Sequence, residues 1–163
     1  MNRPMTHPLF IDIDASHADD NAFPTSIAWS LPDGTIKSVI ISPDSDWDPW
    51  DNASPDIDIQ HLLDQGVSGP DVIREMNEDL DGQTVFVDGL DEDELLLELL
   101  FETYNNTLGF ELATISQLHS RHNFEDLLVM RRQIADEHQF NLDLAEENIQ
   151  ALLHLSERLK AEK

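Results

Sequence analysis

The sequence predicts a mixed α/β fold, in which a mixed sheet of about five strands is flanked by helices. Strand-like segments open the chain, a strand between two helices follows, and the last third has helical periodicity. With 163 residues and 40% hydrophobic residues, the chain is long enough for one domain with a real core. We therefore expect a single domain over 1–163, with loose ends at 1–7 and 161–163.

The first expected strand covers residues 9–16, where Ile11 and Ile13 alternate with Asp12 and Asp14. Successive side chains of a strand point to opposite faces, so the two aspartates share one face, about 7 Å apart. Two carboxylates on an apolar strand are costly unless a positive charge lies between them, and a divalent metal ion is the usual one. The alternative is an edge strand with one face in water.

The rest of the chain alternates between strand and helix signals. Pro32-Asp33-Gly34 is a strong hairpin turn signal between two apolar segments. The helices are expected from apolar residues that recur every three or four positions. The expected elements are strands at 25–31 and 35–42, helices at 57–63 and 70–80, a strand at 84–87, a helix at 95–104, a strand at 110–112, a helical turn to 119, and helices at 122–137 and 142–160.

An acidic loop at 43–55 carries two tryptophans, Trp47 and Trp50. Aromatic rings in such a loop either stack on nucleic-acid bases or pin the loop onto the core. The second role is the more common one for a loop tryptophan, so we expect these rings to be packed.

The charge is strongly acidic, with 9 Lys and Arg against 34 Asp and Glu, and a net charge of −25. Such a surface repels polyanions, which argues against a broad duplex-binding groove and favours divalent cations, basic partners or short substrates. No cysteine is present, so thiolate metal sites are excluded. Residues 1–6 lack the apolar region of a cleavable signal, and no apolar run reaches membrane-spanning length. We expect a cytoplasmic protein with no membrane contact.

Three segments, taken in order, resemble the motifs of the DnaQ-like 3′–5′ exonucleases of the DEDDh group, which have the ribonuclease H-like fold. Asp12-Ile13-Asp14 resembles the Asp-x-Glu motif on the first strand. The strand at 84–87 that runs into Asp93 looks like the second motif, an aspartate that opens a helix. His138 and Asp143 are similar to the His-x4-Asp motif that leads into the last helix. The resemblance covers roughly residues 8–159.

The resemblance implies a metal-dependent 3′–5′ exonuclease that acts on short single-stranded RNA or DNA. Asp12, Asp14, Asp93 and Asp143 would hold two Mg²⁺ or Mn²⁺ ions, which prefer such hard oxygen ligands. The ions would stabilise the attacking and leaving oxygens of the phosphodiester, and His138 would take the proton from the attacking water. Asp12, Asp14 and His138 would then form the catalytic set. Many members of the family are dimers, so a homodimer is implied as well.

The sequence departs from the family pattern at two of these motifs. Asp14 stands where the family has glutamate, and its side chain is one methylene shorter. Glu92 replaces the aromatic residue that usually precedes the second-motif aspartate. Asp88 and Asp91 are therefore alternatives to Asp93 as the metal ligand.

These departures leave two other functions open. The first is a catalytically weakened or inactive exonuclease-like domain, whose acidic face binds a basic protein partner. Residues 54–56, which replace a substrate-contacting Ile-His-Gly segment of the family, favour this alternative. The second is a phosphohydrolase that acts on mononucleotides. The fold alone would accommodate all three functions, so the chemistry of the site has to decide between them.

Overall fold

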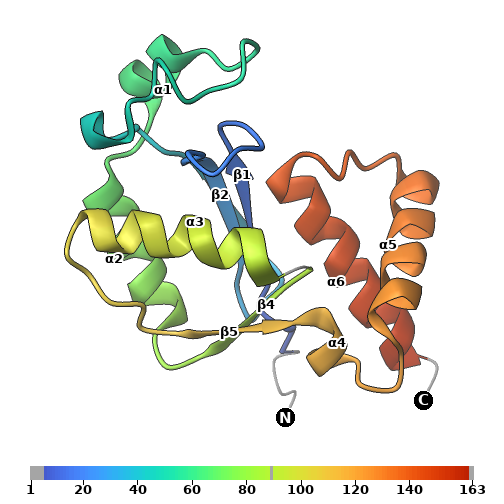
Figure 1. Cartoon of the computed structure of the whole chain (residues 1–163). Helices are drawn as coiled ribbons and strands as arrows, with labels where there is room; N and C mark the ends of the chain where they lie inside the picture. Colours follow the sequence, from blue (N-terminus) through green and yellow to red (C-terminus); the bar gives the residue numbers. More distant parts are fainter. Residues whose placement is uncertain (1–5, 89, 162–163) are drawn as a thin grey trace.

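The computed structural model describes residues 6–88 and 90–161, without the side chains at positions 90, 91 and 161 (Figure 1). It is a mixed α/β structure in which the expected helices and strands are present, with shifted bounds. The terminal residues 1–5 and 162–163, which we expected to be loose, lie outside the described part. The elements in chain order are β1 (Ile11–Ala15), β2 (Pro24–Ser30), β3 (Ile36–Ile40), η1 (Ser45–Trp47), α1 (Ile59–Gln65), α2 (Gly69–Leu80), β4 (Thr84–Val87), α3 (Leu90–Thr103), β5 (Glu111–Thr114), α4 (Ile115–Leu118), α5 (Phe124–His138) and α6 (Ala145–Ala161).

The strands form two sheets, not the single sheet of about five strands that the sequence predicts. Strands β1, β2 and β3 pair antiparallel in that order, and β4 pairs with β5 in parallel. A parallel bridge between Phe10 and Phe86 connects the two sheets, and the Phe86 N–H donates to the Leu9 carbonyl at 2.8 Å. One continuous five-stranded sheet is therefore not confirmed, although β4 lies beside the start of β1.

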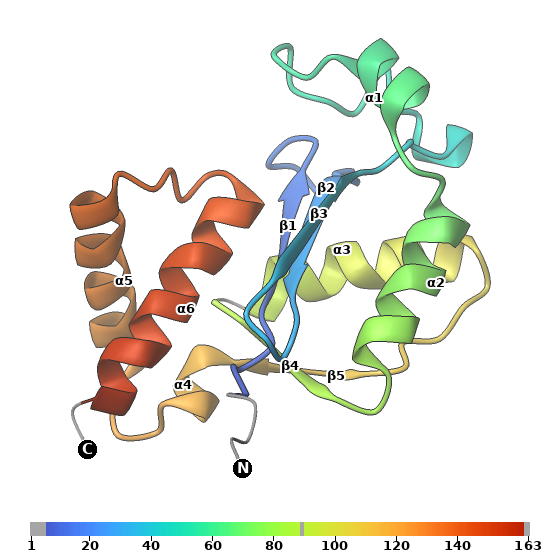
Figure 2. The same cartoon turned by 180° about the vertical axis from the view of Figure 1, so that it is seen from behind.

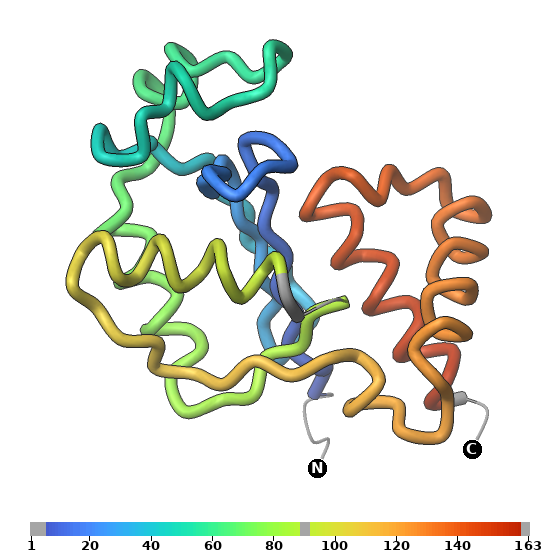
Figure 3. Tube along the Cα trace, viewed as in Figure 1, coloured from blue at the N-terminus to red at the C-terminus, as the bar shows by residue number. Residues whose placement is uncertain are grey.

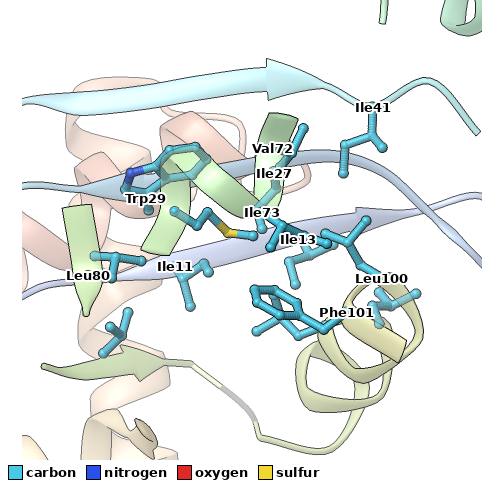
Figure 4. Close-up of a cluster of buried hydrophobic side chains, with 14 of the residues drawn as sticks. Ile11, Ile13, Ile27, Trp29, Ile41, Val72, Ile73, Leu80, Leu100 and Phe101 are labelled. Atoms are coloured by element: carbon cyan, nitrogen blue, oxygen red, sulfur yellow. The ribbon is translucent and has the colours of Figure 1, made fainter. Parts of the chain in front are cut away.

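Helices cover both faces of the antiparallel sheet: α2 and α3 lie on one side, and α5 and α6 on the other (Figure 1 and Figure 2). Ile11 and Ile13 of β1 point into the first of the two cores, together with Trp29 of β2 and Leu100 of α3 (Figure 4). This is the apolar set that the alternating pattern predicts for one face of β1.

The other face of β1 looks toward α6. Phe10, which precedes the strand, is fully buried in the second core with Ala28 and Leu152. Because side chains alternate along a strand, Asp12 and Asp14 lie on this same face. Their partners on β2 are small, Ala28 opposite Asp12 and Ser26 opposite Asp14, which leaves room for the two carboxylates. The sheet thus directs both aspartates toward α6.

Two helix starts differ from the sequence expectation and affect the site. Helix α3 begins at Leu90 instead of residue 95, which places Asp93 in its first turn. Acidic side chains in a first turn interact favourably with the helix dipole, so the acidic segment 91–94 belongs to the helix. Helix α6 begins at Ala145 instead of residue 142, after a turn in which the Leu144 N–H donates to the Asn141 carbonyl at 3.1 Å. Among the described residues, no helix is long and apolar enough to cross a membrane.

The two loop tryptophans have different environments. Trp47 is only 6% exposed, its ring stacks on Phe23 at a centroid distance of 5.7 Å, and its Nε1–H donates to Thr103 Oγ1 at 2.9 Å. Trp50 is 65% exposed. The packing expected of these rings is therefore confirmed for Trp47 and wrong for Trp50. Trp47 alone supplies the buried aromatic area that holds the loop on the core.

Candidate metal centre

Three carboxylates from distant parts of the chain meet beside the sheet. Asp12 lies on β1, Asp88 directly follows β4, and Asp93 lies in the first turn of α3. Each offers a carboxylate oxygen, and these atoms all lie within 4.8 Å of one another. The trace in Figure 3 shows why: the start of α3 reaches β1, and α6 runs along the other side of that strand. We call these three residues the acidic group.

The acidic group is buried enough for its charges to interact strongly. Asp93 is only 7% exposed, and burial, with the charge of Asp12 next in importance, raises its pKa to about 9. Burial and then the charge of Asp88 raise the pKa of Asp12 to about 7, although a hydrogen bond from Asn148 opposes the shift. Carboxylates with such pKa values are poorly compensated by the protein itself, and a divalent cation among them would favour their charged forms.

Asp14 lies near the acidic group but has hydrogen-bond donors of its own. Ser26 Oγ, directly opposite on β2, donates to Asp14 Oδ2 at 2.6 Å. The backbone N–H of Ala145, the first residue of α6, also stabilises the Asp14 carboxylate, yet burial still raises its pKa. Asp14 is therefore held in a defined position at the edge of the same pocket, outside the group of three.

The acidic group opens into a pocket that also contains basic and amide side chains. The helices α5 and α6 supply its opposite wall. Some of the residues that line this pocket are site residues that the sequence predicts, and others are not. The polar side chains that line the pocket are Asp12, Asp14, Asp88, Glu92, Asp93, Thr114, Ser116, Arg131, Arg132, Asp143 and Asn148.

Two of these residues, Asn148 and Arg131, were not predicted as site residues. Asn148 is 1% exposed, and its Nδ2 donates at 3.0 Å to both Asp12 Oδ2 and Asp88 Oδ2. Arg131 forms an ion pair with Asp88 Oδ2 through Nη1, which also donates to Asn148 Oδ1 at 3.0 Å. A signal for them exists in the sequence, because each is a polar residue on the apolar face of a helix. Arg131 lies between the buried residues Leu127 and Ile134 of that face.

Around the start of α6, the chain lines the pocket with Leu142, Asp143 and Asn148. Asp143 is exposed, lines the pocket and raises the pKa of Asp14 through its charge, but does not belong to the acidic group. Asn148 makes the direct contact with Asp12. The spacing from Asp143 to Asn148 equals that from His138 to Asp143. Asp143, which the resemblance implied, thus lines the pocket, and Asn148 is an additional residue five positions further along the chain.

His138 ends α5 and stacks on two rings, those of Phe140 at 5.2 Å and His154 at 4.4 Å between centroids. It is not one of the residues that line the acidic pocket. Its role as a general base stays a prediction. Of the three candidates for the second motif, Asp88 and Asp93 both reach the acidic group, and the Asp91 side chain lies outside the described residues.

The donor set of the acidic group fits a divalent metal ion. Its ligands would be carboxylate oxygens of Asp12, Asp88 and Asp93, the hard donors that Mg²⁺ and Mn²⁺ select. Asn148 and Arg131 already contact carboxylate oxygens of Asp12 and Asp88. An ion that binds there therefore has to share these two carboxylates with them or displace them.

No protein-family model and no curated protein sequence matches this chain. Among solved structures, the chain is similar to the moderately thermophilic exonuclease I from Methylocaldum szegediense, with a TM-score of 0.51 and 16% sequence identity. The match covers 81% of this chain and 30% of the other. The likeness shows the fold. The chain has an exonuclease-like α/β fold and spans less than a third of the length of that exonuclease.

Proposed function

We propose that this chain is a metal-dependent 3′–5′ exonuclease that hydrolyses phosphodiester bonds of short single-stranded RNA or DNA. The observation that carries the proposal is the acidic group, in which carboxylate oxygens of Asp12, Asp88 and Asp93 lie within 4.8 Å of one another at an open pocket. Clusters of buried acids with raised pKa values occur preferentially at functional sites. An exonuclease-like fold around such a cluster makes phosphodiester hydrolysis the reaction that its chemistry fits best.

The chain's own residues supply binding and orientation in this proposal. Mg²⁺ or Mn²⁺ at the acidic group would polarise a phosphoryl oxygen and lower the pKa of a water molecule. Asp12, Asp88 and Asp93 would hold the ion, and Ser26 keeps Asp14 oriented toward the same space. A second ion, with Asp14 and Asp143 as further ligands, belongs to the proposal as a separate prediction.

The proton acceptor is a second separate prediction. His138 would have to leave its stack with His154 to face the pocket. The carboxylates that line the pocket, Asp143 among them, are the other candidate bases. Geometry in the presence of substrate decides between these groups, because catalytic hydrogen bonds often form only in the complex.

The net charge limits the substrate. A chain with a net charge of −25 repels long polyanions, so neutralisation of the phosphate has to come from the metal and the few cations at the pocket. We therefore propose short single strands over duplexes as the substrate.

An inactive exonuclease-like domain that binds a basic protein is the second candidate. The observation that favours it is the pair of contacts from Asn148 and Arg131 to the acidic group. These contacts satisfy carboxylate oxygens without any metal ion. In that function the acidic surface, and not the pocket, would bind the partner protein.

The test is Mn²⁺-dependent hydrolysis of a 5′-labelled short RNA and its DNA counterpart by the wild type, Asp12→Ala and Asp88→Ala. We expect stepwise shortening from the 3′ end that both substitutions abolish. Asp136→Ala, an exposed acid on α5 outside the pocket lining, is the matched control and should retain activity. If no substrate is shortened and Mn²⁺ does not raise the melting temperature, the exonuclease proposal fails and the binding domain is favoured.

A further inference from the structure

We propose that the Arg131 guanidinium is a built-in cation of the acidic pocket, which competes with divalent metal ions for Asp88 and thereby keeps their affinity low. The inference rests on the proposed metal site and adds a residue that opposes metal binding there. The metal would bind only where its concentration is high enough to displace the arginine from the carboxylate.

The first step of the argument is the position of Arg131. Its side chain is only 15% exposed, and its Nη1 contacts Oδ2 of Asp88, a member of the acidic group that would bind the ion. The same nitrogen donates to Asn148 Oδ1 at 3.0 Å. A guanidinium and a divalent cation cannot both lie against one carboxylate without strong repulsion, since two like charges a few ångströms apart are poorly screened at a buried site.

The second step is the geometry of the contact. Arginine usually holds a carboxylate through two parallel hydrogen bonds, which give the pair its strength and orientation. Here Nη1 makes the contact with Asp88, and the buried Nε–H finds no acceptor among the described residues. The guanidinium is thus held on Asp88 by a single charge-assisted hydrogen bond from Nη1. A charge contact without the two-pronged geometry is one that another cation can replace.

The third step is the charge balance of the pocket. One guanidinium faces three carboxylates, Asp12, Asp88 and Asp93, so the acidic group still attracts cations while Arg131 is in place. Asn148 adds donors to Asp12 and Asp88 but no charge. The arrangement therefore weakens metal binding without abolishing it.

The other described cations that form ion pairs do so away from this pocket: Lys37 pairs with Glu75 and Asp79, Arg74 with Asp71, and Arg158 with Glu137. Arg132, the neighbour of Arg131 on α5, also lines the pocket but is exposed and forms no ion pair within 6–88 and 90–161. Arg132 thus provides a control with the same charge and nearly the same place in the chain.

The experiment is calorimetric titration of the full chain with Mn²⁺, using the wild type, Arg131→Met and Arg132→Met. Removal of a unit charge a few ångströms from a divalent ion, at the effective dielectric constant of a partly buried site, should tighten Mn²⁺ binding by Arg131→Met at least about tenfold. Arg132→Met should change the affinity by no more than about threefold, because an exposed charge is screened by water and salt. Arg131→Lys, which keeps the charge, should stay closer to the wild type than Arg131→Met does.

Equal effects of Arg131→Met and Arg132→Met would overturn the inference, because they would reduce it to net charge. Unchanged or weaker Mn²⁺ binding by Arg131→Met would also overturn it, since Arg131 would then be a scaffold of the site. If circular dichroism shows that Arg131→Met does not fold, Arg131→Gln removes the charge, keeps a donor for Asn148 and is judged by the same criterion.

The two proposals fail in distinguishable ways. Tighter Mn²⁺ binding by Arg131→Met without hydrolysis by any variant would support the competition between Arg131 and the metal, and would contradict the exonuclease proposal. Hydrolysis by the wild type, with no change of Mn²⁺ affinity in Arg131→Met, would support the exonuclease proposal and contradict the competition between Arg131 and the metal. Absence of Mn²⁺ binding by every variant would remove both.

Discussion

Asn148 Nδ2 donates a hydrogen bond of 3.0 Å to Asp12 Oδ2, across a sequence separation of 136 residues. The contact joins the buried face of α6 to the strand from which the site is built. It places a neutral amide against the carboxylate that the sequence predicts as the first metal ligand. The same amide contacts Asp88 Oδ2, so one side chain connects two members of the acidic group.

Asn148→Asp is expected to make the stability of the protein depend on metal. A fourth carboxylate, at a position only 1% exposed, adds an uncompensated buried charge and should lower the free energy of unfolding by about 2 kcal/mol or more without metal. This corresponds to a fall in melting temperature of at least about 4 °C for a chain of this size. Mn²⁺ should recover most of the loss.

Gln133→Glu, which adds the same charge at an exposed position of α5, is the control for this substitution. Thermal melts with EDTA and with Mn²⁺ give the comparison. If the Asn148→Asp protein is as stable as the wild type in EDTA, a neutral side chain between the buried acids is not needed for stability.

The raised pKa values predict that the metal-free protein loses stability as the pH rises. The pKa of Asp12 is about 7 and that of Asp93 about 9 in the folded state, against a reference value of 3.8. Between the reference and folded values the folded chain binds more protons than the unfolded chain. Its free energy of unfolding therefore decreases with pH over that interval and levels off above it.

Asp12→Asn removes one of these titrating groups, so its stability relative to the wild type should increase between pH 4 and about pH 8. Urea denaturation in EDTA at several pH values measures the difference. A difference that stays constant with pH would show that Asp12 is not titrating in this interval.

Ser26→Ala tests the hydrogen bond that orients the Asp14 carboxylate. The hydroxyl donates to Asp14 Oδ2 at 2.6 Å, and hydrogen bonds to charged groups contribute about 1.5–3 kcal/mol. We expect the substitution to lower the free energy of unfolding by about that amount at a pH where Asp14 is ionised, and to raise the pKa of Asp14 further. Ser38→Ala, at an exposed position of β3, should have little effect. Equal losses for the two variants in urea denaturation would contradict this role of Ser26.

The tryptophans of the 43–55 loop should differ sharply in their contribution to stability. Trp47→Ala removes a ring that stacks on Phe23 and a donor to Thr103, and should cost about 3–5 kcal/mol. Trp50→Ala, at a 65% exposed position, should change stability by no more than about 0.5 kcal/mol. Chemical denaturation measures both, and a large loss for Trp50→Ala would show a contact that the described structure does not contain.

Local patterns were enough to predict most of the helices and strands, although not how the strands pair. The alternation of Ile11 and Ile13 with Asp12 and Asp14 predicts both the strand and the shared face of the two acids, because side-chain direction in a strand has a period of two. Helix faces such as that of α2 follow from apolar spacing in the same way. Helix starts were less predictable, and the acidic segment 91–94 in the first turn of α3 shows why. Its residues are compatible with a loop or with a first helical turn.

What only the tertiary structure decided is the composition of the site. Asp88 and Asp93 join Asp12 because β4 and the start of α3 lie beside β1. Asn148 and Arg131 reach these carboxylates because α6 packs against β1 and α5 packs against α6. No local spacing encodes contacts between such distant segments. The sequence by itself determined that two acids of the first strand share one face. The packing of helices decided that an arginine and an asparagine lie among the acids, because long-range contacts depend on how faces pair and not on the period within each element.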